Sequence, residues 1–259
     1  MNRLFILIFL SGCFFGIYQR PKTLGEGNMD FSFGASFQFT TNPYDRRDIE
    51  SNGYRLLPNL GFDFAYGVLN GFDVGIHFSG AGLGPFARFS LFKQKINYVE
   101  NEFILAPFVM YDFLFSKSVG LRLDAIYSWQ LNRYFEPFIF YQVYYHPYFE
   151  KFASEPLGGK PVGNIGSGFY HFFGLASGFN IYLTKKKSKK EPPDLRFNFE
   201  LGFLPVELAS QNKIIPVLNF GLSFGGSGLF TCYRDGYYQF CPGDIFIRII
   251  SLIFGAGLN

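Results

Sequence analysis

The chain has 259 residues, 17% of them charged, and a formal net charge of +3. Soluble globular proteins carry about 25% charged residues, and so small a positive charge gives no reason to expect a nucleic-acid partner. No run of apolar residues approaches the roughly 18 that a membrane-spanning helix needs, so the sequence excludes a helical membrane protein.

The first element of the chain is a predicted signal peptide. Residues 1–12 combine a positive start, an apolar run (LFILIFL) and two small residues, which is the arrangement of an export signal. Residues 10–13, Leu-Ser-Gly-Cys, resemble the lipobox of bacterial lipoproteins, and the resemblance implies cleavage before Cys13 and acylation of this cysteine. The alternative is an ordinary signal peptide in which a cysteine falls near the cut. Both interpretations export the chain, and residues 13–28 are expected to form a short tether.

Residues 29–39 alternate without interruption between apolar residues and small or polar ones, as a strand with one apolar face does. Their number matches the roughly 9–11 residues of a tilted membrane-spanning strand. Residues 40–57 are rich in charge and are expected to form a solvated loop. With 37 Phe and 30 Gly in the chain, strands of this kind show large rings on one face and small residues on the other.

Residues 60–78 are predicted to form a β-hairpin, because the same alternation continues on both sides of Leu-Asn-Gly at residues 69–71. We expect a three-residue loop with Gly71 in the left-handed conformation, because a two-residue Asn-Gly turn would mix the two faces. In this register Asp63 lies opposite His77 on the polar face. The apolar pairs are then Val68 with Phe72, Tyr66 with Val74, Phe64 with Ile76, and Phe62 with Phe78.

The remaining strands follow in chain order. Residues 103–114 are ambiguous, because Phe108 and Met110 share a face with Asp112. About ten strands result, an even number as in single-chain bacterial barrels, so we predict an all-β fold, an antiparallel up-and-down transmembrane β-barrel. The alternative is a soluble β-sandwich, because alternation does not distinguish lipid from a facing sheet. The further predicted strands are residues 86–92, 103–114, 119–131, 137–145, 169–183, 195–203 and 217–225.

Over residues 29–226 the pattern resembles that of the small outer-membrane β-barrels of diderm bacteria, the OmpA-like class of eight to ten strands. The resemblance implies a place in the bacterial outer membrane, in contact with its lipid. A first strand that leaves a periplasmic tether runs outward, so the long loops 40–57 and 147–167 fall on the outer side, available to an extracellular ligand. The chain departs from this class in its lipobox and in continuing past Phe224, since such barrels commonly end on an aromatic residue.

The polar face of these strands would line the barrel interior. Because the charges there have mixed sign, we expect a lumen filled by paired side chains, with Asp63 and His77 as one pair, and a structural or surface-exposed binding protein. The alternative is a narrow pore or conduit for small molecules. The predicted lumen set is Asp63, Asp73, His77, Arg88, Arg122, Asp124, Arg196 and Glu200.

An enzyme is not expected. His146 and His171 flank the loop 147–167, which contains Glu150 and Ser154, as catalytic groups do in outer-membrane proteases and lipid deacylases, but nothing in the sequence fixes their geometry. Three histidines without ligand spacing give no metal site, and no motif calls for a cofactor.

Residues 227–259 are predicted to form a C-terminal hairpin and an amphipathic tail, with helical spacing over residues 245–254. Export places Cys232 and Cys241 in an oxidising compartment, where we expect a disulfide. A type II′ turn that begins at Gly236 pairs these two cysteines, whereas an Asp235-Gly236 turn pairs Cys232 with Gln239 instead. Two unlinked thiols are the alternative.

Overall fold

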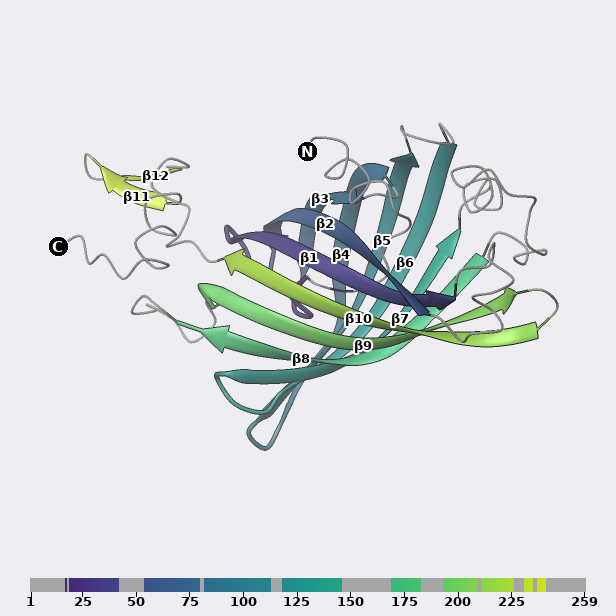
Figure 1. Ribbon diagram of the computed structural model, residues 1–259. Coiled ribbons are helices and arrows are strands. Elements are labelled where there is room, and N and C mark those ends of the chain that lie inside the picture. The colour runs from purple at the N-terminus through teal and green to yellow at the C-terminus, as the bar shows by residue number, and fades with distance from the viewer. Residues whose placement is uncertain are drawn as a thin grey trace, which may run out of the picture.

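The computed structural model describes Ile17 and residues 19–41, 54–79, 82–112, 118–145, 169–182, 193–208, 211–225, 231–234 and 237–240. Ten antiparallel strands close into a barrel, in which each strand pairs with its neighbours in the chain and β1 pairs with β10 (Figure 1). The strands are β1 (Met29–Thr41), β2 (Tyr54–Leu69), β3 (Phe72–Ser79), β4 (Gly82–Ile96), β5 (Val99–Asp112), β6 (Ser118–Gln130), β7 (Phe135–Tyr145), β8 (Phe169–Ile181), β9 (Leu195–Leu208) and β10 (Gln211–Gly225). Nowhere in these ranges does a helix have the length and apolar character needed to cross a membrane.

The predicted all-β barrel of about ten strands is confirmed, and the sandwich alternative is wrong because the sheet closes on itself. Alternation along the strands sorts side chains between outside and inside. On β2, for example, Phe64 is 39% exposed on the outer surface whereas Asp63 is 2% exposed in the interior. The barrel therefore has apolar rows outside and many polar groups inside.

The hairpin of β2 and β3 has the predicted register over most of its length. Phe64 pairs with Ile76 and Asp63 with His77, and Gly71 has φ +88°, the left-handed conformation that glycine adopts without strain. At the turn the pairing differs from the prediction, because Leu69 rather than Val68 lies opposite Phe72. A β-bulge, one extra residue on β2, accounts for the shift.

Strands β4 and β5 extend further than predicted, through the polar residues 93–102. Their turn is at Asn97 and Tyr98, and Asn97 has φ 56°. Lys93 lies opposite Glu102, and Lys95 lies opposite Glu100. Opposite charges that face each other across two strands stabilise the pair, which explains why this hydrophilic stretch is a strand.

The two mouths of the barrel differ. One, called the turn mouth below, holds the short connections 70–71, 97–98 and 131–134, together with the start of β1 and the end of β10. The opposite one, called the loop mouth, is where the connections 42–53 and 146–168 leave the barrel. Those two connections, which make up most of the predicted outer loops, lie outside the described residues.

After the barrel, β11 (Thr231–Arg234) and β12 (Tyr237–Phe240) form a separate two-stranded sheet. Its register contradicts our type II′ prediction, because Cys232 lies opposite Gln239. The connection is the two residues 235–236, an Asp-Gly pair, which is a favoured composition for a two-residue hairpin loop. The register that motivated the disulfide is thus wrong. Cys241, the predicted helical tail 245–254 and Cys13 lie outside the described residues.

Candidate functional site

The polar lumen is the candidate site, and all eight residues predicted to line it are buried there: Asp63, Asp73, His77, Arg88, Arg122, Asp124, Arg196 and Glu200. The sequence reasoning missed Glu102 and Glu136, which are equally buried. Both lie near the start of a strand that begins before the predicted boundary, so they were assigned to connections. The earlier starts of β5 and β7 bring these two carboxylates into the lumen near the turn mouth.

Most lumen charges are paired. Arg88 Nη2 lies 2.8 Å from Asp73 Oδ2, and Arg122 Nη2 lies 3.1 Å from Asp124 Oδ2. Because an unpaired charge in a buried site is costly, pairing of this kind is what a filled lumen requires.

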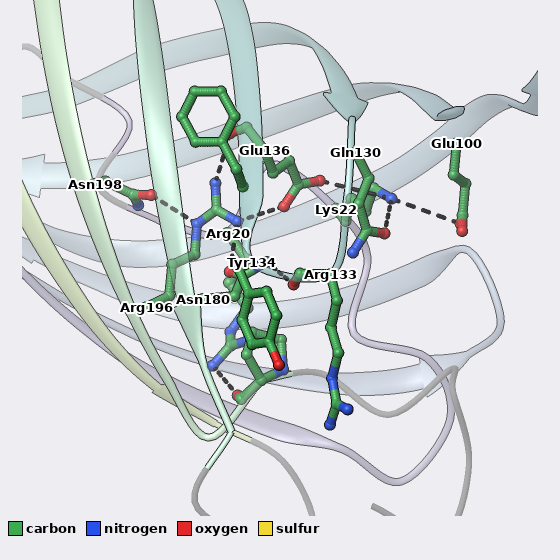
Figure 2. Close-up of polar contacts among 12 residues, drawn as sticks. Arg20, Lys22, Glu100, Gln130, Arg133, Tyr134, Glu136, Asn180, Arg196 and Asn198 are labelled. Atoms are coloured by element: carbon green, nitrogen blue, oxygen red, sulfur yellow. Dashed lines mark hydrogen bonds and ion pairs between the residues drawn. The ribbon is translucent and has the colours of Figure 1, made fainter. Parts of the chain in front are cut away.

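Arg196 is the most extensively bound of the lumen cations. Its Nη1 forms an ion pair with Glu136 and lies 3.0 Å from Asn180 Oδ1, while its Nε donates to Asn198 Oδ1 at 2.6 Å. Figure 2 shows Arg196 between Asn198 and Glu136. Arg196 therefore ties β9 to β7 and β8.

Asp63 and His77 form the predicted pair, and a third residue joins them. His77 Nδ1 lies 2.7 Å from Asp63 Oδ1, and His77 Nε2 lies 3.1 Å from Ser79 Oγ. All three side chains are buried. The sequence contains a signal for Ser79 that we did not use: Ser79 stands two residues after His77, and residues with this spacing face the same side of a strand.

The largest difference from prediction concerns the expected tether. Ile17 and residues 19–28 are called the lumen segment below. Ile17 and residues 19–24 lie inside the barrel, where they contact inward-facing carboxylates from several strands, and residues 25–28 form a turn at the turn mouth. Five of these carboxylates accept hydrogen bonds from the segment: Glu200 from Ile17 N (2.8 Å), Asp63 from Gln19 Nε2 (2.7 Å), Asp30 from Arg20 Nε (2.5 Å), Glu102 from Thr23 N (3.2 Å) and Oγ1 (2.8 Å), and Asp73 from Leu24 N (3.1 Å to each oxygen).

Two consecutive carbonyls of the lumen segment are held by opposite walls. Asn198 on β9 donates to Gln19 O at 3.1 Å, and Arg88 on β4 donates to Arg20 O at 2.9 Å. In the closed order of ten strands, β4 and β9 are five positions apart in either direction. The segment therefore crosses the middle of the lumen.

Aromatic rings fill much of the remaining interior. Phe86 stacks on Phe108 with ring centroids 4.8 Å apart, and Phe140 lies 5.3 Å from Phe172. Glycine makes room for one of these rings, since a Cβ built on Gly202 would lie 2.0 Å from Phe172 Cζ. Strands β4–β8 supply most of the bulky inward side chains, whereas β9, β10, β1 and β2 present mostly small or polar ones.

A cavity of about 560 Å³ lies at the turn mouth, between the lumen segment and the barrel wall. Lys22 projects into it, donates to Gln130 Oε1 at 2.8 Å and lies 3.6 Å from both Glu100 and Glu136 (Figure 2). Tyr182, just after β8, also lines it. Burial raises the pKa of the Tyr182 phenol, an effect that the nearby guanidinium of Arg133 opposes.

Of the two histidines considered for catalysis, the structure describes His171 alone. His171 is exposed on the outer surface of β8, where its Nδ1 lies 2.6 Å from the hydroxyl of Tyr141. His146, Glu150 and Ser154 lie outside the described residues. Among the residues that are described, no three His, Cys, Asp or Glu side chains gather as a metal site would require.

No protein-family model and no curated protein matches this chain. Solved structures that are similar to it include Ail, the attachment invasion locus protein of Yersinia pestis, with TM-score 0.25, 11% identity, and coverage of 77% of this chain and 99% of that one. The NanC porin matches with TM-score 0.37, 13% identity, and coverage of 76% and 98%. Neisserial surface protein A matches with TM-score 0.32, 11% identity, and coverage of 77% and 97%.

Proposed function

We propose that this chain is an outer-membrane β-barrel protein. Support comes from the distribution of its side chains, with large apolar residues on the outer surface and charged residues buried inside, the reverse of a soluble protein. A closed barrel pairs its backbone groups between strands and leaves no sheet edge, which is what the hydrocarbon core of a bilayer requires. Each strand of the barrel except the eight-residue β3 has at least eleven residues, enough to cross with the usual tilt.

Its role in that membrane is structural, or binding through the loop mouth, with a lumen that does not conduct. One observation carries this proposal. Asn198 and Arg88, which lie on opposite sides of the barrel, donate hydrogen bonds to the backbone carbonyls of Gln19 and Arg20 inside the lumen. The rings of Phe108 and Phe140 close the interior further. A barrel of about ten strands encloses little more space than side chains fill, so one extended segment is enough to block it.

Planar-bilayer recording tests this role. Folded full-length protein, checked by gel mobility before and after boiling, is added to one chamber, and its insertion is confirmed by recovery from the bilayer lipid. We expect no stepwise current under either polarity. Current steps of uniform size from the folded protein would contradict the proposal and favour a conduit.

We also propose that Cys13 is acylated, on the strength of the lipobox at residues 10–13. Ile17, four residues after Cys13, is the nearest residue that the structure describes, and its backbone N–H is bound to Glu200 within the lumen.

A further inference from the structure

The hydrogen-bonded chain Asp63–His77–Ser79 has the connectivity of a nucleophilic catalytic site. Cross-strand pairing places Asp63 beside His77, and the two-residue spacing along β3 places Ser79 on the same face. With Nδ1 of His77 donating to Asp63, Nε2 is left to accept the hydroxyl proton of Ser79. The 3.1 Å between Nε2 and the Ser79 oxygen lies within the range at which a base takes a proton from a nucleophile, and the 2.7 Å between Nδ1 and Asp63 is a hydrogen bond that orients the base.

We propose that Ser79 is the nucleophile of an acyl-transfer site in the lumen, with His77 as its general base and Asp63 as a positioning residue. Ser79 is the last residue of β3, at the end of that strand away from the turn mouth, and it is only 1% exposed, so the substrate class is a small acyl ester that must displace some of the surrounding packing to reach it. This role goes beyond a structural barrel and departs from our expectation that the chain is not an enzyme.

Each step of the reaction balances. The Ser79 hydroxyl oxygen bonds to the ester carbonyl carbon while its proton passes to His77 Nε2. The carbon–oxygen bond to the alcohol then breaks, and the alcohol leaves with that proton. Water subsequently attacks the acyl-serine, gives a proton to His77, and releases the acid as the Ser79 hydroxyl is restored.

Arg122 supplies a second, independent observation. Its Nε and Nη1 are buried and have no hydrogen-bond partner, although a buried donor of this kind usually has one. Arg122 lies over the ring of Phe108, 3.5 Å from the centroid, and His77 packs edge-on against the same ring at 5.7 Å. A guanidinium held near the base is suited to stabilise the oxyanion that forms when an ester is attacked.

The lumen segment takes part in this site through Gln19. While His77 occupies Oδ1 of Asp63, Gln19 Nε2 donates to Oδ2 at 2.7 Å, so both carboxylate oxygens are held. A carboxylate fixed on both sides keeps the imidazole in one orientation, which is the contribution of the third member of such a triad. The segment therefore closes the lumen and orients the site at the same time.

A fluorophosphonate probe tests the nucleophile directly. Folded full-length protein in detergent is incubated with the probe, and the adduct is located by peptide mass mapping. We expect one adduct, on Ser79, that is absent from Ser79→Ala. Ser32 is the matched control, because it is an equally buried lumen serine bonded to Asp30 and Ser223 rather than to histidine. Ser32→Ala should be labelled like the wild type.

Hydrolysis of p-nitrophenyl acetate gives a second readout. We expect wild-type turnover to exceed that of Ser79→Ala by about 100-fold or more, the contribution typical of a positioned base and nucleophile. Asp63→Asn should lower kcat with little change in KM, and Asp63→Glu should recover part of the loss in kcat. A carboxylate with a merely structural role would not affect kcat and KM so differently.

Unlabelled Ser79 in the folded wild type would overturn the proposal, as would equal hydrolysis by the wild type and Ser79→Ala. Either result would leave the non-conducting barrel untouched, because that proposal is decided by current recordings. Conversely, a wild-type protein that conducts current and still carries the probe on Ser79 would contradict the proposed non-conducting role and support Ser79 as a nucleophile.

Discussion

Arg88 and Asn198 lie on opposite walls of the barrel, yet they donate hydrogen bonds to the carbonyls of two consecutive residues, Arg20 and Gln19. A peptide held from both sides in this way occupies the middle of the lumen. The wall around it is rich in buried carboxylates, and the segment brings Arg20 and Lys22 together with backbone N–H donors. The interior of this barrel is therefore complementary to its own N-terminal residues.

The outer surface should tolerate apolar side chains and reject charged ones. Phe64→Arg places a charge on the exposed apolar face of β2 and should cost about 2–4 kcal/mol if the position lies near the middle of the membrane. Tyr98→Arg is the control, because Tyr98 is 92% exposed in the β4–β5 turn. Unfolding by denaturant in lipid vesicles measures both. Equal stability of the two variants would mean that the apolar rows do not face lipid.

Removing Arg196 should destabilise the barrel strongly. Arg196→Met leaves Glu136 as an uncompensated buried charge, which typically costs about 3–5 kcal/mol. Adding Glu136→Gln should recover much of this loss, because the charge is then gone. Lys95→Met is the control, because Lys95 is exposed where it lies opposite Glu100, and a surface pair of this kind contributes no more than about 1 kcal/mol. A single Arg196 variant as stable as the Lys95 variant would argue against a closed, dry network around Arg196.

Gly202 should not accept a methyl group. Its Cβ would lie 2.0 Å from Phe172 Cζ, so Gly202→Ala forces the ring to move and should cost about 1–3 kcal/mol. In a Phe172→Leu background the same change should cost much less, because the ring is absent. Denaturant midpoints of the four proteins give the coupling energy. Additive effects would show that the two residues do not touch.

Acylation of Cys13 should be detectable with a palmitate analogue. We expect label on the wild type and none on Cys13→Ala, and intact mass should show a lipid-modified N-terminus. Two or more chains anchor a protein stably where one does so only marginally. A mature N-terminus without lipid would refute the modification and leave the barrel unaffected.

Where one face is strictly apolar, the sequence was sufficient to place strands and lumen charges. Residues 29–39 and 119–131 alternate cleanly, and the pairing of Asp63 with His77 followed from a register that only one choice of loop kept consistent. Strands β5 and β7 were harder to interpret, because Phe108 and Phe138 point into the lumen and make both faces apolar. Ring-filled interiors weaken the period-two signal on which such predictions depend.

The lumen segment was the main feature that sequence reasoning missed. Residues 17–28 have no period and contain proline and glycine, so locally they look like a linker. Their partners, such as Glu200 and Glu102, are far away in the chain. In addition, the donors are backbone N–H groups, which every residue except proline has, so the amino-acid sequence of the segment does not reveal that it binds carboxylates. Ser79 was missed for a different reason, since its spacing from His77 was visible but the polar face of β3 was interpreted only as lumen filling.

Amide hydrogen exchange tests most directly whether Ile17 and residues 19–24 occupy the lumen. The backbone N–H groups of Ile17, Thr23 and Leu24 are donated to Glu200, Glu102 and Asp73. In folded protein we expect these three amides to exchange slowly, on the scale of the barrel strands, and to speed up together when the barrel unfolds. Exchange of all three at the rate of an unstructured peptide, while the strands stay protected, would show a tether outside the barrel and contradict this account.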